Sequence, residues 1–381
     1  MKTMKNKIWL IVSIAIIVII LLVAIIGSNS NITGLLVLKT PEEQIIKMGA
    51  VLPLTGSTAF AGEQIRDGMI MAVDEINAKG GINGRQVVLV LGDSKSNVQE
   101  GVAAFNNMTN LQDPVVIVSA MSSVAMAVVP LAEQNQVPVI ATIASVPNLT
   151  TNEWSFRYFP TAKQEVPPIV EAANDLGVKK IGVLYLNDDF GVSMFNTLKE
   201  QYNGEVVGES FLISTSDFRT QLNKLKSEDV DAILFVGFSS HIINSIKQSK
   251  ELDMNVAVFI PSTAAFKDVR SALNEMNVKA YAGIPELYRN DDSKAEDFKT
   301  QFKAKYNKDA DHYATTGYDI VYLIKKSIGK SNYTKAEIKD GLSEITEFNG
   351  INGDASINGR EFSFPLVQAT IENGNIKYIN N

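Results

Sequence analysis

The sequence predicts an α/β protein with two doubly wound, Rossmann-like lobes, preceded by an N-terminal membrane helix. Three observations predict this fold. Short β-branched runs alternate with amphipathic segments from residue 45 onward, and nineteen uncharged apolar residues stand near the N-terminus. The chain of 381 residues is also long enough to bury two hydrophobic cores.

The uncharged run, Ile8–Ile26, follows three lysines within the first seven residues. A helix of this length rises about 28 Å, close to the thickness of the hydrocarbon core of a bilayer. We therefore predict that residues 1–26 are a signal anchor with a cytoplasmic N-terminus, and that residues 27–44 are a tether. A cleaved signal peptide is the alternative. A buried core helix fits poorly, because no charged residue interrupts the run.

Strand-like runs recur through the body of the chain. Several are apolar almost throughout, as expected of parallel strands that are covered on both faces. Apolar residues at helical spacing between them, such as Ile65, Met69 and Ile76, indicate the covering helices. The predicted strands are the runs at residues 45–53, 86–93, 113–120, 137–144, 179–186, 205–213, 230–238, 255–262 and 279–286.

The segment EINAKGGINGR, residues 75–85, has three glycines in five positions, as a phosphate-binding loop can have. Such a loop follows a strand and precedes a helix. Here the order is reversed, since the predicted helix 64–79 comes first and the strand 86–93 second. We therefore predict that Gly80 ends the helix in a left-handed conformation and that Asn83-Gly84 forms a turn.

Composition argues against several classes of function. The net charge is −7, and the first 40 residues carry four lysines and no acid, so the remainder carries −7 − 4 = −11. This acidic body argues against nucleic acid as a partner. The chain has no cysteine and two histidines, and it has no G-x-S-x-G, H-E-x-x-H or P-loop motif. We therefore expect no enzyme activity, no metal site and no cofactor.

Ligands of open α/β sheets bind beyond the carboxyl ends of the strands, so residues that follow the predicted strands are candidate contacts. In the first half these residues are small, and several carry hydroxyl groups. A serine at the start of a helix can cap that helix or bind a carboxylate together with free N–H groups, and both roles stay open. The candidates are Ala61, Ser122, Ser123, Ile143 and Ser145.

In the second half the strand ends offer Phe190, Phe238 and Ser262. An aromatic side chain at a strand end belongs either to the core or to the wall of a ligand site. Polar anchors facing apolar covers suit a small organic molecule.

The segment VLPLTGSTAFAGEQIRDGMIMAVDEINAKGGINGR, residues 51–85, resembles the opening of type I periplasmic binding proteins. Within that family it is most similar to the leucine/isoleucine/valine-binding solute-binding components of ABC transporters. Shorter matches extend the resemblance over about residues 45–375, and they are PNLT at 147–150, FRYFP at 156–160, DDFG at 188–191, DF at 217–218 and TGYDIVYLI at 316–324.

The resemblance implies two lobes that are joined by three crossover segments and close on a ligand. The crossovers are expected near Arg157–Thr161, Ile284–Leu287 and Phe348–Asp354. Lobe 1 is expected to comprise residues 45–161 and 285–348, and lobe 2 residues 162–284 and 349–381.

The resemblance also implies roles for site residues. Ser122 and Ser145 match positions that hold an α-carboxylate, and the carbonyl of Ile143 is available to an ammonium group. Phe190 and Phe238 match aromatic residues that cover the ligand, where the family often has tyrosine.

The family's acidic residue for the ammonium group falls at Ser262. Because that acid is missing, we predict a carboxylate- or amide-bearing, partly apolar ligand in preference to free leucine, isoleucine or valine. An acid supplied by Asp188, Asp189 or Glu286 would change this expectation.

The predicted function is that of an extracytoplasmic solute-binding protein, anchored to the cytoplasmic membrane, that delivers a small-molecule ligand to an ABC permease. The alternative is a membrane-anchored ligand-sensing domain of a signalling system. Neighbouring permease and ATPase genes would favour the transport function over the signalling function.

Overall fold

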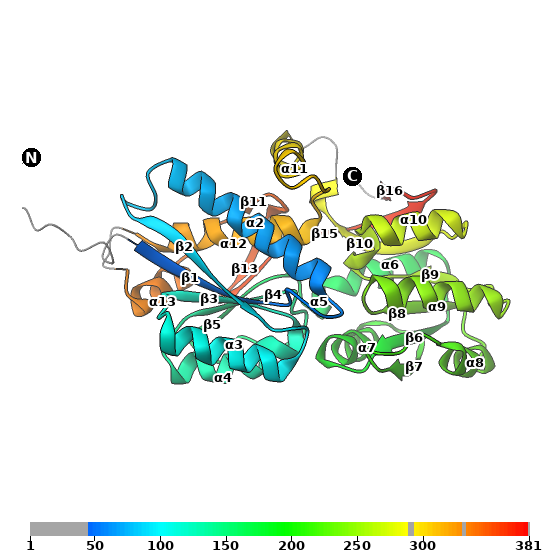
Figure 1. The fold of residues 1–381 in the computed structure, drawn as a ribbon. Coiled ribbons are helices and arrows are strands. Elements are labelled where there is room, and N and C mark those ends of the chain that lie inside the picture. The colour runs from blue at the N-terminus through cyan, green and yellow to red at the C-terminus, as the bar shows by residue number, and fades with distance from the viewer. Residues whose placement is uncertain (1–44, 289–292, 330–332, 380–381) are drawn as a thin grey trace, which may run out of the picture. The chain divides into compact units, whose positions relative to one another are not determined.

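The computed structural model describes residues 45–288, 293–329 and 333–379, and within them two large mixed β-sheets form (Figure 1). The strands of the first sheet are β1 (Ile45–Leu52), β2 (Gln86–Asp93), β3 (Val116–Ala120), β4 (Val139–Thr142), β5 (Ser155–Tyr158), β13 (Ser356–Asn358) and β14 (Glu361–Ser363). Those of the second are β6 (Lys180–Leu186), β7 (Glu205–Phe211), β8 (Ala232–Val236), β9 (Ala257–Phe259), β10 (Ala280–Pro285), β15 (Leu366–Glu372) and β16 (Asn375–Tyr378). A separate antiparallel pair consists of β11 (Asn349–Gly350) and β12 (Gly353–Asp354).

The first five strands have the same order in both sheets. The first runs β2-β1-β3-β4-β5-β14-β13 and the second β7-β6-β8-β9-β10-β15-β16. The first five strands of each sheet are parallel and follow the order 2-1-3-4-5 of a doubly wound fold. The predicted doubly wound α/β architecture with two similar halves is confirmed.

Helices cover both faces of each sheet (Figure 1), and we call a sheet with its helices a lobe. On the first sheet, one face carries α2 (Ala59–Ala78), α12 (His312–Ser327) and α13 (Lys335–Ser343), and the other α3 (Val98–Leu111) and α4 (Ser122–Gln134). On the second, one face carries α6 (Pro167–Asp175) and α7 (Asp189–Gln201), and the other α8 (Arg219–Ser227), α9 (Ser239–Glu251) and α10 (Lys267–Glu275). The remaining helices are α5 (Ala162–Glu165), α11 (Ser293–Tyr306) and the 3₁₀ turns η2 (Ser262–Ala265) and η3 (Glu286–Tyr288).

This double cover explains the apolar runs in the sequence. Every residue of β3 and of β8 is buried, because helices pack on both sides of these central strands. Nine of the parallel strands, β1 to β4 and β6 to β10, lie within the nine predicted runs.

The glycine-rich segment after α2 is a structural turn, as predicted. Gly80 has φ +93°, and the N–H of Gly81 donates to the carbonyl of Ile76, which ends the helix. Asn83 and Gly84 also have positive φ and form the turn that leads into β2.

The C-terminal segment corrects the predicted lobe boundary. We expected a crossover at Phe348–Asp354 and residues 349–381 entirely in lobe 2. Strands β13 and β14 instead extend the first sheet, so the chain passes to the second sheet only between Ser363 and Leu366. Two- and three-residue strands carry too little periodicity to be assigned to a sheet from sequence.

The predicted membrane helix, residues 8–26, lies outside the described residues. Among the helices that the structure describes, none combines the length and the apolar character of a membrane span.

Candidate ligand-binding site

A cavity lies where the carboxyl ends of strands from both sheets meet. It encloses about 480 Å³ of space not occupied by protein atoms, part of it open to solvent. Its lining residues are Met121, Ser122, Ile143, Ser145, Phe159, Glu165, Asp188, Phe190, Phe238, Pro261, Ser262, Thr263 and Tyr313.

One wall comes from the ends of β3 and β4. Ser122 is the first residue of α4 and is only 3% exposed, and its hydroxyl has no hydrogen-bond partner among the described residues. The two residues that turn the chain here have left-handed backbones, with φ +78° at Met121 and φ +39° at Ile143. Such conformations are strained for side chains of this size, and they concentrate at ligand sites.

The segment around Ser145 is held by a buried arginine on β5. The guanidinium of Arg157 donates to the carbonyl oxygens of Ala144 and Val146, at 3.0 and 2.6 Å, and to Oε1 of Glu361 at 2.8 Å. The carbonyl of Ser145 in turn accepts from the N–H of Ala162, at 2.8 Å, where α5 begins. The position of Ser145 is therefore fixed from both sides.

The apolar wall is aromatic. Phe190 lies in the first turn of α7, and Phe238 directly precedes α9. Phe159 and Tyr313 complete it, with ring centroids 6.2 Å apart. Burial raises the pKa of Tyr313 well above its ordinary range, so its hydroxyl is neutral at physiological pH.

Two carboxyl groups reach the cavity. Asp188 caps α7 by accepting from the N–H of Gly191 at 2.9 Å, and burial, reinforced by the charge of Asp189, raises its pKa to about 6. Glu165 ends the short helix α5 and is 2% exposed. Its oxygens accept from the N–H and from the hydroxyl of Ser262, each at 2.9 Å. Burial raises the pKa of Glu165 to about 7, although both hydrogen bonds oppose the shift.

Six of the eight residues predicted from sequence line this cavity: Ser122, Ile143, Ser145, Phe190, Phe238 and Ser262. Ala61 and Ser123 do not. Helix α2 begins at Ala59, so Ala61 lies inside the helix and packs in the core rather than in a loop. Ser123 is turned away because successive residues of a helix point about 100° apart. Of the three suggested substitute acids, Asp188 lines the cavity, whereas Asp189 and Glu286 do not.

Sequence reasoning missed Glu165, Phe159 and Tyr313 as lining residues, whereas Thr263 follows the same predicted strand as Ser262. Phe159 lies within FRYFP, which was noted only as a family motif. Glu165 follows no strand directly, and its contact with Ser262 spans 97 residues, so no local signal identifies it.

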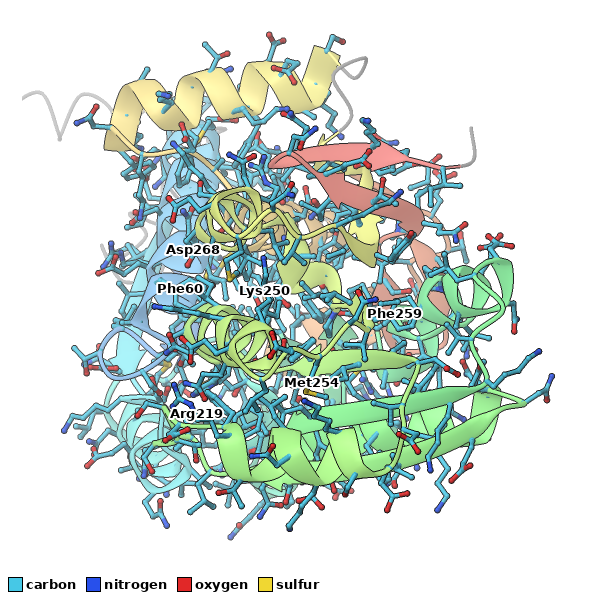
Figure 2. All side chains as sticks on the ribbon, turned by 90° about the vertical axis from the view of Figure 1, so that its right-hand side faces the viewer. Phe60, Arg219, Lys250, Met254, Phe259 and Asp268 are labelled. Carbon is cyan, nitrogen blue, oxygen red and sulfur yellow. The ribbon has the colours of Figure 1, made fainter. Side chains whose placement is uncertain are left out.

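A larger, more open groove lies elsewhere, and Phe60 and Asp268 on its lining are labelled in Figure 2. Across it Lys267 pairs with Asp309 at 2.7 Å, and the rings of Phe266 and His312 stack at 4.9 Å. These contacts join the beginning of α10 in the second lobe to the beginning of α12 in the first and to Asp309, which precedes α12. No residue predicted for the site lines this groove. Nowhere in the described part of the chain do acidic and histidine side chains form a group that could hold a metal ion.

A family model described as "Periplasmic binding protein" matches residues 45–374. The Leu/Ile/Val-binding protein BraC3 of Rhizobium johnstonii is 30% identical over 51% of this chain, and that match spans about half of the relative, 54%. The leucine-, isoleucine-, valine-, threonine- and alanine-binding protein of Pseudomonas aeruginosa is 24% identical over 77% of this chain and 80% of the relative.

Among solved structures, the branched-chain amino acid transporter substrate binding protein LivJ of Streptococcus pneumoniae, in complex with isoleucine, matches with a TM-score of 0.78. It is 26% identical, and the match covers 87% of this chain and 98% of that one. A Rhodopseudomonas palustris solute binding protein in complex with benzoate shares the fold, with a TM-score of 0.76 at 20% identity.

These relatives are binding proteins and not enzymes, as expected for a chain without catalytic motifs. The chain belongs to the periplasmic binding protein family, as a type I member of the leucine/isoleucine/valine-binding kind.

Proposed function

We propose that this chain is the extracytoplasmic solute-binding component of an ABC transporter and that it captures a small organic ligand between its two lobes. The observation that carries the proposal is the cavity at the strand ends of both sheets. It contains two hydroxyls, of Ser122 and Thr263, that are buried and lack a partner among the described residues. Buried polar atoms are rarely left unpaired unless a ligand or solvent satisfies them.

The roles of the lining residues follow from their chemistry. Ser122 and Ser145 hold a carboxylate or a similar polar end, with the first N–H groups of α4 contributing. Phe159, Phe190 and Phe238 cover the apolar part of the ligand. Because the lining comes from both lobes, the lobes separate to admit the ligand and close over it. Residues 8–26 anchor the protein to the membrane, and an ABC permease receives the ligand.

Thermal denaturation of the purified full-length protein with a panel of amino acids, amides and carboxylic acids tests this proposal. A ligand at a hundredfold excess over its Kd stabilises the folded form by roughly 2.7 kcal/mol, which raises the melting temperature measurably. The transport role predicts that the liganded protein stimulates ATP hydrolysis by its reconstituted permease. A panel in which no compound raises the melting temperature would contradict a solute-binding role for this cavity.

A further inference from the structure

The lining of the cavity contains acidic side chains but no basic ones among the described residues. Glu165 and Asp188 line it, and no lysine, arginine or histidine lines it among the residues that the structure describes. A buried carboxylate without a positive partner is costly, because the interior solvates charge poorly. A carboxylate that lines a ligand cavity although its burial is unfavourable is a candidate for a functional contact.

Glu165 is held in one orientation. Both of its oxygens accept one hydrogen bond each from Ser262, at 2.9 Å, and a carboxylate has further acceptor sites beyond these two. Its helix is fixed as well, since the side chain of Gln164 accepts from the N–H of Thr161 at 2.8 Å and donates to Ser363. The remaining lone pairs of the Glu165 carboxylate can therefore accept hydrogen bonds from a donor within the cavity.

The position of the acid is informative. Ser262 stands where the resemblance predicts the ammonium-binding acid, and this departure suggested a ligand without an ammonium group. The structure instead brings a carboxylate to Ser262 from helix α5, and Ser262 donates both of its hydrogen bonds to it. An acid is therefore present beside position 262, although it lies 97 residues away along the chain.

We propose that Glu165, oriented by Ser262, is a specificity-determining residue that binds the ammonium group of a zwitterionic amino acid. The inference rests on the proposed function, because it needs a ligand in this cavity. Ser122 and Ser145 then receive the α-carboxylate, so the two charged groups on the α-carbon are recognised by side chains from different elements of the lining. An uncharged amide or a des-amino acid leaves the Glu165 carboxylate without a counter-charge.

Other ionisable groups also face this site. Asp188 lines it from α7, and Tyr313 from α12, while the groups contributed by α4 and η2 are hydroxyls. Asp311 lies beside Tyr313 and adds negative charge there. Because Asp188 and Glu165 both have raised pKa values, the pH dependence of the wild type alone does not separate them.

The test is calorimetric titration of the full-length protein at pH 8. The probes are the L-amino acid that gives the largest thermal shift and its des-amino analogue, for example leucine and 4-methylpentanoate. The wild type should prefer the amino acid, and Glu165→Gln should weaken amino-acid binding roughly tenfold to hundredfold, as for loss of a charge-assisted hydrogen bond. Binding of the des-amino analogue should change less than threefold, or improve. Asp189→Asn, in the first turn of α7 but outside the cavity lining, is the matched control and should leave amino-acid binding unchanged. Asp188→Asn removes the other acid of the cavity while keeping the helix cap, and a larger loss of amino-acid binding there than in Glu165→Gln would overturn the inference.

A pH series supplies a second readout. Amino-acid affinity of the wild type should fall roughly tenfold between pH 8 and pH 6 as Glu165 takes up a proton, and Glu165→Gln should flatten this dependence. Equal losses for both probes in Glu165→Gln would mean a merely structural role and would overturn the inference. A wild type that binds the des-amino analogue as tightly as the amino acid would leave the solute-binding function intact and refute the role of Glu165. If no amino, amide or carboxylic acid binds, the proposed function itself fails.

Discussion

Replacing Glu165 by glutamine should stabilise the ligand-free protein at neutral and alkaline pH. The pKa of this carboxyl rises from its ordinary value of 4.5 to about 7 in the folded protein. A pKa that is higher in the folded than in the unfolded protein means that the folded protein favours the protonated carboxyl. The contribution of Glu165 to the stability of the folded protein is therefore complete below pH 4.5 and is lost as the pH rises towards 7. At about 1.4 kcal/mol per pKa unit, the ionised carboxylate costs roughly 3 kcal/mol above pH 7.

Glutamine has the shape of the protonated acid and can keep both contacts with Ser262. Its amide oxygen can accept from the Ser262 N–H, and its NH₂ group can donate to the hydroxyl. The free energy of unfolding of Glu165→Gln should therefore equal that of the wild type near pH 4.5. It should exceed the wild-type value by up to about 3 kcal/mol at pH 8.

Urea denaturation followed by circular dichroism, at pH 4.5, 6 and 8 after removal of bound ligand, measures this difference. Asp188, Asp311 and Asp319 also have raised pKa values, and burial lowers the pKa values of His241 and His312. The stability of both proteins therefore changes with pH for reasons other than Glu165, and only the difference between them reports Glu165. Glu200→Gln, an exposed change on α7, is the control and should show no pH-dependent difference. A Glu165→Gln protein that is no more stable than the wild type at pH 8 would refute the reasoning.

Three further predictions concern the cavity wall, its support and the N-terminus. Ser122→Ala and Ser145→Ala should each weaken ligand binding by roughly 1–3 kcal/mol in calorimetric titration, and unchanged affinity in both would place the ligand elsewhere. Arg157→Met should lower the free energy of unfolding by roughly 2–5 kcal/mol, because the carbonyls of Ala144 and Val146 and the carboxylate of Glu361 lose their donor. It should also weaken ligand binding through Ser145, whereas the exposed change Arg219→Met should do neither. The mature protein should retain Met1–Lys7 and fractionate with membranes, and a soluble chain that begins near Ser28 would show cleavage instead.

The parallel strands could be predicted because the burial of each strand is visible in its own sequence. A strand covered on both faces, such as β3 or β8, is apolar along its whole length and is recognisable without its neighbours. β5 was missed because Arg157 interrupts it, and that arginine is buried only because it binds the carbonyls of the neighbouring segment. The hairpins β13–β14 and β15–β16 did leave a signal, since Asn358-Gly359 and Asn373-Gly374 are typical hairpin turns.

Part of the cavity lining could be predicted from the rule that ligands of open α/β sheets bind beyond the carboxyl ends of the strands. That rule identified Ser122, Ser145 and Phe238, because the carboxyl ends of parallel strands share one edge of a sheet. It could not identify Glu165 or Tyr313, since both belong to helices whose placement depends on packing between distant segments. The absence of an acid at position 262 is consequently visible in the sequence, whereas the contact of Glu165 with Ser262 is not.

Residues 356–378 supply β13 and β14 to the first sheet and β15 and β16 to the second. During synthesis, therefore, neither lobe can complete its sheet until this last segment has left the ribosome. In many two-lobed proteins the N-terminal lobe folds first. Here both lobes need residues 356–378 before their sheets are complete. In an extracytoplasmic protein, as we propose this one to be, the same order would keep the polypeptide incompletely folded while it is translocated across the membrane. It also means that a protein truncated before residue 356 would expose β5 and β10 as unpaired edges in both lobes, and such edges invite aggregation.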